Sequence, residues 1–439
     1  MHEIKKIPRQ SHDYTLIDKY NNRENNFNRQ YAHIYTERLL IYRPILIKYC
    51  EKKFGNKYEV KKLHEVKSAE KLCIVIGTIF KHMPLRPTIF KKIANDHLPN
   101  HHIGKFIKPS DSLIIEDELQ RATLVGNIFK ENLVIGVTLA IICCEDKQGC
   151  LFVEDYIFPP LPKQIPYVLI NKPSKYVALI SGLGLSNQNL RMTQIQLMID
   201  TINGMILGDE KNPLTIEMAN IVRVIIAGNS IGEDIYLDNL STRAKYISNK
   251  ICLSSFDKIK QLDDLLFGLA SSVNVDIMAG PYDPANIMLP QQPLNKRLFQ
   301  KCVKLSSFNS VSNPYECIID GIRILGTSGQ NIDDIYKYTD FDDRLEILEN
   351  TLKWTHMAPT CPDSLPCYPF FNNEPFVMKE CPHIYFAGNQ AEFKWKHYQG
   401  DDGQKVLLIN VPEFHKTSQM VLINISNFTC RTILFNTTL

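Results

Sequence analysis

The chain has 439 residues, enough for two or three domains, and 44% of them are hydrophobic and 22% charged, as in an ordinary globular protein. Its 50 basic and 47 acidic residues leave a formal charge of +3, which excludes a strong overall attraction to nucleic acid or to an anionic membrane. The longest apolar run, 133–144, is interrupted by Gly136 and Thr138 and predicts a buried strand rather than a membrane span. The N-terminus lacks the apolar core of a secretory signal, so we expect the protein to stay inside the cell.

The N-terminal residues 1–36 are polar and rich in Asn, with scattered aromatic side chains that could hold the segment against a folded surface. We expect this segment to form an arm. Apolar positions between 38 and 54 then predict short helical pieces that are broken at Pro44, where the backbone has no N–H group to donate.

Short runs rich in β-forming residues follow, and their number predicts a small Greek-key barrel of the OB type. The runs are 72–80, 113–115, 122–125, 133–144 and 151–156. Such barrels often bind single-stranded nucleic acid through exposed aromatic side chains in a basic groove. The aromatic residues of these runs, Phe80, Phe152 and Tyr156, have few basic neighbours, which favours a role in core packing.

The proline-rich segment 158–167 stiffens the chain and indicates a domain boundary. Beyond it, strand-like runs alternate with helical patterns at 187–205 and 256–269, which predicts a layered α/β domain. Further strands are expected at 406–411, 421–425 and 432–435. The predicted domains are the arm 1–36, the barrel with its helical lead-in 37–160, and the α/β domain 161–439.

Five glycine-marked loops follow strand-like runs in this α/β domain, within 177–186, 221–229, 273–283, 317–331 and 383–390. Ligands of open α/β sheets collect at the carboxyl ends of the strands, so a site is expected there. The order of the loops resembles the frame of calcineurin-like phosphoesterases, in which these loops carry the Asp, Asn and His ligands of two divalent cations.

Almost every ligand position of that frame holds a residue unable to bind a metal ion. We therefore assign a degenerate site, without catalytic residues, metal or cofactor, to Gly182, Gly184, Asn229, Pro281, Tyr282, Asp283, Ser328, Asn389 and Ala391. Two divalent ions bring four positive charges, whereas these loops offer one carboxylate, Asp283, and the weak amide oxygens of Asn229 and Asn389. Asp283 precedes a proline and fits the role of an acid that caps a turn.

Several other residues resemble site residues but have simpler explanations. Gly208 and Asp209 follow a helical pattern rather than a strand, as expected of a helix end. His356 lies outside the ligand motifs and is expected to be a hydrogen-bonded structural histidine. The cysteines sit mostly in hydrophobic runs, which predicts reduced thiols, and one loosely spaced set lacks the tight spacing of a zinc site. That set is Cys361, Cys367, Cys381 and His383.

An OB-type barrel followed by an eroded phosphoesterase frame resembles the B subunits of eukaryotic replicative DNA polymerases. The resemblance is carried by the segments LIIEDELQR (113–121), FVEDY (152–156), LPQQPL (289–294), NPY (313–315), DGIRILGTSGQN (320–331), APTCPD (358–363) and ECPHIYFAGN (380–389). It implies a non-catalytic scaffold in a nuclear polymerase complex that acts in replication and repair synthesis. The partners it implies are the cysteine-rich C-terminal domain of the catalytic subunit and the N-terminal domain of a third, clamp-associated subunit, with at most weak or indirect contact to DNA.

Two alternative functions remain open at this point. One is a metal-dependent phosphoesterase or 3'-5' exonuclease that uses unconventional ligands. The other is a single-strand DNA-binding module built on the barrel, which would show a salt-sensitive affinity for oligonucleotides.

Overall fold

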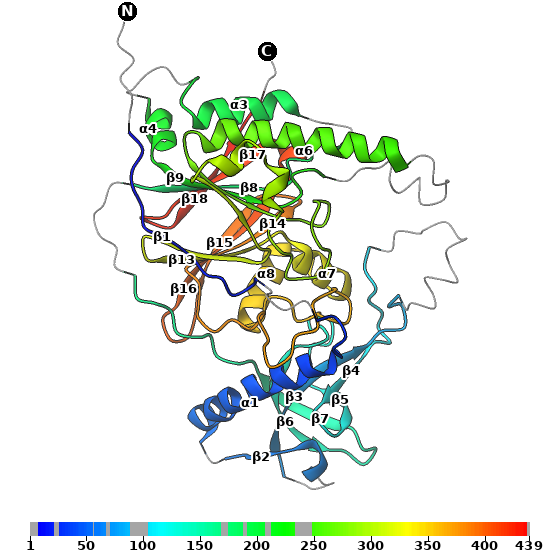
Figure 1. The fold of residues 1–439 in the computed structure, drawn as a ribbon. Helices are drawn as coiled ribbons and strands as arrows, with labels where there is room; N and C mark the ends of the chain where they lie inside the picture. The colour runs from blue at the N-terminus through cyan, green and yellow to red at the C-terminus, as the bar shows by residue number, and fades with distance from the viewer. Residues whose placement is uncertain are drawn as a thin grey trace, which may run out of the picture.

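The computed structural model describes residues 8–21, 26–55, 57–66, 71–87, 104–167, 174–187, 191–206, 212–232 and 248–436, with residues 248–255 described as backbone alone. Within these ranges the chain forms three six-stranded sheets, one in a barrel and two packed face to face (Figure 1). The predicted Gly208–Asp209 motif lies outside the described residues. None of the described helices is long and apolar enough to cross a membrane.

The barrel is closed because the long strand β3 (Cys73–His82) pairs with β4 (Ser112–Glu116) on one side and with β6 (Thr138–Glu145) on the other. Buried side chains such as Val75, Ile115, Ile141 and Val153 fill its interior, while intervening positions on β4 and β7 are more exposed. Closure leaves few free strand edges, as expected of this class of barrel. Its strands are β2 (Glu59–Lys61), β3 (Cys73–His82), β4 (Ser112–Glu116), β5 (Arg121–Gly126), β6 (Thr138–Glu145) and β7 (Leu151–Ile157).

Helix α1 (Ala32–Phe54) packs against the barrel, and it corrects one prediction. The expected break at Pro44 is wrong, because the helix runs through this residue without interruption. Its buried residues Leu39, Tyr42 and Leu46 join a cluster with residues of β3 and β6. This packing offsets the hydrogen bond that Pro44 cannot donate to the carbonyl oxygen of Leu40. Leu40 lies on the exposed side of the helix.

The remaining two sheets face each other and form what we call the sandwich. One has the order β11-β10-β9-β8-β17-β18 and the other β1-β12-β13-β14-β16-β15. Apolar residues of both sheets, among them Ile225, Phe386 and Ile409, meet between them. The strands of the first sheet are β8 (Tyr176–Ile180), β9 (Ile221–Ala227), β10 (Asn274–Met278), β11 (Phe308–Val311), β17 (Gln419–Asn424) and β18 (Thr429–Leu434). Those of the second are β1 (Tyr14–Leu16), β12 (Tyr315–Ile319), β13 (Ile322–Thr327), β14 (Ile384–Gln390), β15 (Lys394–Gln399) and β16 (Lys405–Pro412).

Helices cover both outer faces of the sandwich (Figure 1). Helices α3 (Met192–Ile202), α4 (Pro213–Ala219) and α6 (Ser248–Ala270) cover the sheet that contains β8 to β10, through buried residues such as Ile195, Ile199 and Leu266. Helices α7 (Gln330–Tyr338) and α8 (Arg344–Lys353) cover the other sheet on the side of the barrel. Short elements complete the described chain: α9 (Phe414–Thr417), η1 (Leu63–Glu65), η2 (Lys296–Leu298) and η3 (Cys302–Lys304).

The first described residues, 8–21, lie along the sandwich. Strand β1 pairs antiparallel with β12, and the guanidinium of Arg9 donates to the carbonyl oxygens of Ile202, Met218 and Ile221. The aromatic side chain of Tyr20 is buried, as the sequence suggested for this segment. This part of the N-terminal segment is therefore anchored by both backbone and side-chain contacts.

The buried guanidinium of Arg38, on α1, joins the barrel to the sandwich. Its Nη1 donates to the carbonyl oxygens of Gly136, at 2.9 Å, and Pro359, at 3.0 Å. Its Nη2 donates to the carbonyl oxygen of Cys361, at 3.1 Å, and to the carboxylate of Glu374, at 3.3 Å. One side chain thus connects the helix, a barrel loop and two segments of the sandwich.

His356 completes this buried group, which we call the Arg38 cluster (Arg38, His356 and Glu374). Its Nδ1 accepts from the N–H of Ala358, which places the proton of the neutral ring on Nε2, 3.6 Å from Glu374. Burial and the adjacent charge of Arg38 lower the pKa of His356 to about 4. Burial opposes ionisation of Glu374, but Arg38 and His356 hold its pKa below the ordinary value. At neutral pH the cluster therefore contains one guanidinium, one carboxylate and a neutral imidazole.

Replacing Arg38 with Met should reduce the free energy of unfolding by about 3–5 kcal/mol, because it leaves a buried carboxylate without its counter-ion. Arg43→Met is the matched control on the same helix, since the Arg43–Glu118 pair is partly exposed and should contribute no more than about 1 kcal/mol. Urea unfolding measures both. Equal losses in the two variants would contradict the role of Arg38.

Acidification should destabilise the protein through His356. Because its pKa is about 4 in the folded state and about 6.5 in an unfolded chain, the unfolded state binds the proton more readily, and stability falls as the pH drops from 6.5 towards 4. The loss approaches roughly 3 kcal/mol. Unfolding free energies at several pH values should show a shallower decline for His356→Asn, whose amide can still accept from Ala358. Identical pH profiles would exclude His356 as the cause.

Candidate functional site

The carboxyl ends of the parallel strands meet at one edge of the sandwich, where the sequence predicted a degenerate site. The loops after β8 and β9 touch through Gly182 N–H to Gly228 O, at 2.9 Å, and Gly184 N–H to Asn229 O, at 3.1 Å. The loop after β10 joins them through Tyr282 N–H, which donates to Asn229 Oδ1 at 3.2 Å. Loops distant in the sequence thus form one continuous hydrogen-bonded surface.

The structure brings together seven of the nine predicted site residues through hydrogen bonds or close approach: Gly182, Gly184, Asn229, Tyr282, Asp283, Ser328 and Asn389. The other two, Pro281 and Ala391, are exposed. One boundary differs from the prediction, because Asn389 lies within β14 rather than in a loop after it.

The glycines of this edge are packed so closely that side chains are excluded. A Cβ atom at Gly182 would lie 2.8 Å from Asn389 Oδ1, and one at Gly228 would lie 2.2 Å from Ser328 Oγ. Gly182 also has a φ of +62°, which disfavours other residues. An Asp side chain at position 182 does not fit without rearrangement of the site.

The amide of Asn389 occupies the centre of the edge. Its Nδ2 donates to the carbonyl oxygens of Ala227, at 2.9 Å, and Ser328, at 2.8 Å, and lies 3.2 Å from Ser328 Oγ. Its backbone N–H donates to Ser181 Oγ at 2.9 Å. The amide hydrogens therefore satisfy oxygen atoms from the ends of β9 and β13 without any cation.

Asp283, the one carboxylate of the site, is used by the backbone. It is buried, with Oδ1 accepting from Ile231 N–H and Oδ2 from Gly280 N–H, both at 2.9 Å. Burial raises its pKa above the ordinary value, although these N–H groups oppose the shift. These are the contacts of an acid that closes a turn, and they engage both carboxylate oxygens.

A second group of amides, which sequence reasoning missed, adjoins Ser328. Asn313 Nδ2 donates to Gln291 Oε1 and Gln330 Oε1, both at 2.8 Å, and Asn313 Oδ1 accepts from Ser328 N–H at 3.0 Å. Gln291 Nε2 donates to Gly280 O at 3.1 Å. These residues lie in the segments LPQQPL, NPY and DGIRILGTSGQN, so the family-like motifs contained the signal, but no chemical role could be read from them.

The charged groups of the described residues do not assemble into a metal centre. Over the described ranges, no group of three or more His, Cys, Asp or Glu side chains could hold a metal ion. His356 belongs to the Arg38 cluster at the junction with the barrel, not to the strand ends. The predicted site residues therefore offer hydrogen bonding and one carboxylate that is already engaged. Glu413 and His415, whose Oε2 and Nε2 atoms lie 3.4 Å apart, adjoin them, and His415 N–H donates to Gly182 O at 2.9 Å.

Comparison with known proteins identifies the family. Residues 177–394 match the family of B subunits of DNA polymerases alpha and epsilon, and residues 30–156 match the DNA polymerase delta subunit OB-fold domain. The chain is 42% identical over 367 residues to the DNA polymerase delta small subunit of Oryza sativa subsp. japonica, covering 83% of this chain and 84% of that protein. The chain belongs to the DNA polymerase delta small-subunit family.

Other family members match over nearly their whole length. The DNA polymerase delta small subunit of Arabidopsis thaliana is 38% identical over 434 residues, covering 98% of this chain and 97% of that protein. DNA polymerase delta subunit 2 of Drosophila melanogaster is 36% identical over 414 residues, covering 94% of each.

Family membership confirms the resemblance seen in the sequence motifs and assigns the chain to the accessory subunits of a DNA polymerase that acts in replication. It also confirms the OB-type barrel within a mixed α/β chain of several sheets.

Replacing Asn389 with Asp should destabilise the protein, because a carboxylate there cannot donate to Ala227 O and Ser328 O and adds negative charge beside them. The expected loss is about 2–4 kcal/mol. Asn427→Asp is the control, since this exposed side chain serves as an acceptor and should change stability by less than about 0.5 kcal/mol. Urea unfolding with and without manganese provides the measurement. Strong stabilisation of wild-type protein by manganese would contradict a site closed by amides.

Proposed function

We propose that this small-subunit family member is a non-catalytic scaffold of the DNA polymerase delta holoenzyme in the nucleus. It bridges the cysteine-rich C-terminal domain of the catalytic subunit and a third, clamp-associated subunit during replication and repair synthesis. The observation that carries the proposal is the Asn389 amide, which donates to the carbonyl oxygens of Ala227 and Ser328 at the centre of the strand-end edge. A site closed in this way supports docking rather than hydrolysis, and no cofactor is required.

The domain organisation is part of this proposal. Residues 1–36 form the arm, which includes the first residues of α1, 37–160 the OB-fold domain with the rest of α1, and 161–439 an inactive phosphoesterase-like domain. Two facing sheets with helices on both outer faces support the last assignment. The eroded ligand positions are the nine residues of the strand-end site, and the packing around Gly182 and Gly228 agrees with lost catalysis.

Rigid attachment of the barrel to the sandwich suits a scaffold. Besides Arg38, the buried Lys81 of β3 crosses the junction, with Nζ donating to the carbonyl oxygens of Leu133, at 3.0 Å, and Tyr338, at 2.9 Å. Burial lowers the pKa of Lys81 to about 8. Since both residues donate to backbone carbonyls across the junction, and Arg38 also to the buried Glu374, the two parts present their surfaces in a fixed relation.

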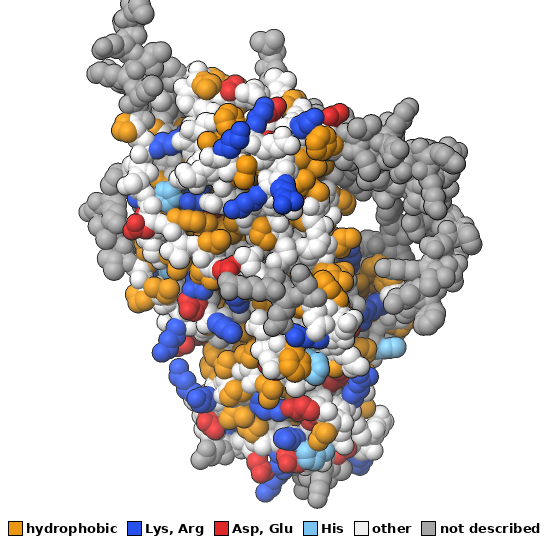
Figure 2. All heavy atoms as spheres, viewed as in Figure 1, with side chains coloured by type: hydrophobic (Ala, Val, Ile, Leu, Met, Phe, Trp, Pro, Cys, Tyr) orange, Lys and Arg blue, Asp and Glu red, His pale blue; other side chains and the backbone are white. Residues whose placement is uncertain are grey.

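The electrostatics of the barrel give little support to the single-strand DNA alternative. The exposed Phe152 is followed on β7 by Glu154 and Asp155, and Arg121, which lies over the Phe80 ring, is paired with Glu116. Over the face shown in Figure 2, basic side chains are mixed with acidic and hydrophobic ones. A phosphate backbone would meet carboxylates close to the aromatic rings.

The decisive experiment is co-expression of the full chain with the C-terminal domain of the catalytic subunit and the N-terminal domain of the third subunit. We expect both to co-elute with the chain in size-exclusion chromatography. The same protein, with manganese, should not hydrolyse a nucleotide diester or single-stranded DNA. The scaffold function would be overturned if the chain bound neither partner. Manganese-dependent turnover that Asp283→Ala abolishes would also overturn it.

A further inference from the structure

A groove follows the linker that leaves β7. Its first part lies between the barrel, with α1, and the sandwich, and its second part lies between the linker and the sandwich. It consists of two adjoining cavities of about 570 Å³ and 750 Å³, which share Leu161, Asp402 and Gln404. Each volume lies in the range of ligand-binding pockets. We call the two together the junction groove.

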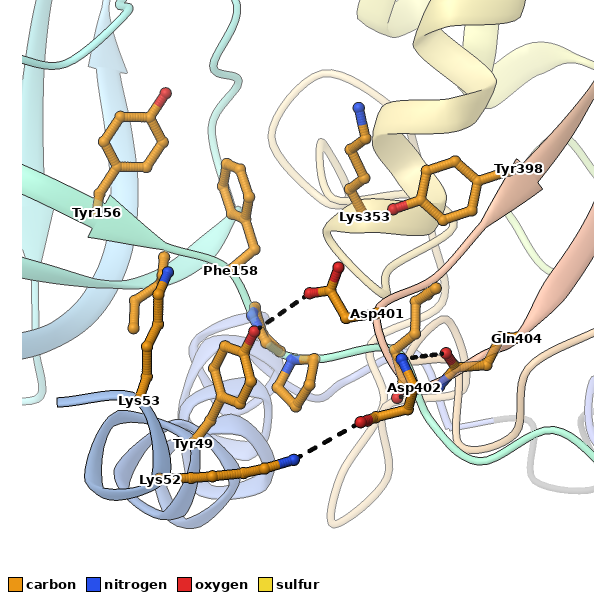
Figure 3. A pocket seen from close by; sticks show the side chains of 14 residues that line it. Tyr49, Lys52, Lys53, Tyr156, Phe158, Lys353, Tyr398, Asp401, Asp402 and Gln404 are labelled. Atoms are coloured by element: carbon orange, nitrogen blue, oxygen red, sulfur yellow. Dashed lines mark hydrogen bonds and ion pairs between the residues drawn. The ribbon is translucent and has the colours of Figure 1, made fainter. Parts of the chain in front are cut away.

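Aromatic rings form the walls of the first cavity (Figure 3). Tyr49 comes from α1, Tyr156 and Phe158 from the end of β7 and the linker, and Tyr398 from β15. The second cavity adds Tyr167 and Phe428, whose ring centroids are 5.3 Å apart. Partly exposed rings in concave walls are typical of surfaces that anchor apolar side chains of a partner.

The contacts across the groove are weak. Tyr49 OH lies 3.4 Å from Asp401, and Lys52 Nζ lies 3.6 Å from Asp402 (Figure 3). The Lys52 and Asp402 side chains are 73% and 60% exposed, so their pair contributes little to stability. An incoming chain could displace these contacts at small cost.

The groove carries a surplus of positive charge. Lys52, Lys53 and Lys353 line the first cavity and Lys163 and Lys405 the second, against Asp401 and Asp402. Lys353 is neutralised by Glu349, at 2.6 Å. Lys53, Lys163 and Lys405 make no ion pair with an acidic side chain in the described part of the chain. All three are exposed and lie on both halves of the groove.

We propose that the junction groove binds an extended acidic peptide segment of another subunit of the polymerase complex. Apolar side chains of the segment enter the two cavities, and its carboxylates face Lys53, Lys163 and Lys405. This inference rests on the scaffold function and names one docking site for it. A peptide is favoured over single-stranded DNA because Asp402, which lines both cavities, would repel a phosphate backbone but can accept from peptide N–H groups.

The first test is a fluorescence-anisotropy titration of the full chain with a labelled peptide of alternating Glu and Leu residues, long enough to span both cavities. Alternation places the two side-chain types on opposite faces of an extended chain. We expect binding that weakens with added salt. A peptide with Lys in place of Glu, and oligothymidylate, should bind more weakly. Stronger binding of either would overturn the proposal.

The matched variants are Lys53→Glu, Lys163→Glu and Lys405→Glu in one protein, with Lys304→Glu, an exposed lysine of η3 outside the groove, as control. Reversing three exposed charges should weaken binding of the acidic peptide about tenfold. The control should match wild type, and the melting temperatures of all proteins should be similar. Equal affinity of the triple variant and wild type would exclude the groove as the peptide site.

The second test separates this inference from the scaffold function. In the co-expression experiment, the triple variant should lose one partner and keep the other. If it keeps both, the groove proposal fails while the scaffold function stands. If wild type binds neither partner, the scaffold function fails, and the groove proposal, as a subunit docking site, fails with it whatever the peptide does.

Discussion

The arrangement of the whole molecule depends on one buried guanidinium. Arg38 carries a charge that only hydrogen bonds and a counter-ion can stabilise away from water. Four acceptors supply that environment, and they come from a barrel loop and from two segments of the sandwich. A barrel displaced from the sandwich would leave both Arg38 and Glu374 unpaired. This electrostatic requirement, together with Lys81 and the apolar cluster that the two parts share, fixes how they pack.

The strand-end edge shows a different solution, since neutral groups satisfy most of its oxygen atoms, although Asn389 Oδ1 is buried without a hydrogen-bond partner. Asn389, Asn313 and Gln291 donate to carbonyl and amide oxygen atoms that converge there, and the carboxylate of Asp283 accepts from backbone N–H groups. Neutral donors therefore hold these loops together. An edge of this kind orders the surrounding loops, which suits the docking role proposed for the protein.

Local patterns in the sequence predicted five of the six described barrel strands and the alternation of the sandwich, because the hydrophobic pattern of a strand depends on its own residues. They missed the short, exposed β2 and started the strand of β6 at 133 instead of Thr138. The loops at the strand ends could also be located, since they sit at fixed places in the strand order. The packing between distant segments could not be predicted from the sequence. The helix through Pro44 is kept by contacts with β3 and β6, and the partners of Arg38 are 98 to 336 residues away. Likewise, the pairing of Gln291 with Asn313 depends on loops that only the folded sandwich brings together.

The rigid joint and the open groove lie at the same junction and act differently on binding. The buried contacts of Arg38 and Lys81 prevent the barrel from moving against the sandwich, so both walls of the junction groove are already in place before a partner arrives. Binding then does not have to restrict the relative motion of two domains, and more of the interaction energy appears as affinity. The weak Lys52–Asp402 and Tyr49–Asp401 contacts lie only across the groove, where their loss does not loosen the joint. Strong contacts within the junction and weak ones across its surface are therefore the distribution that a preorganised docking groove requires.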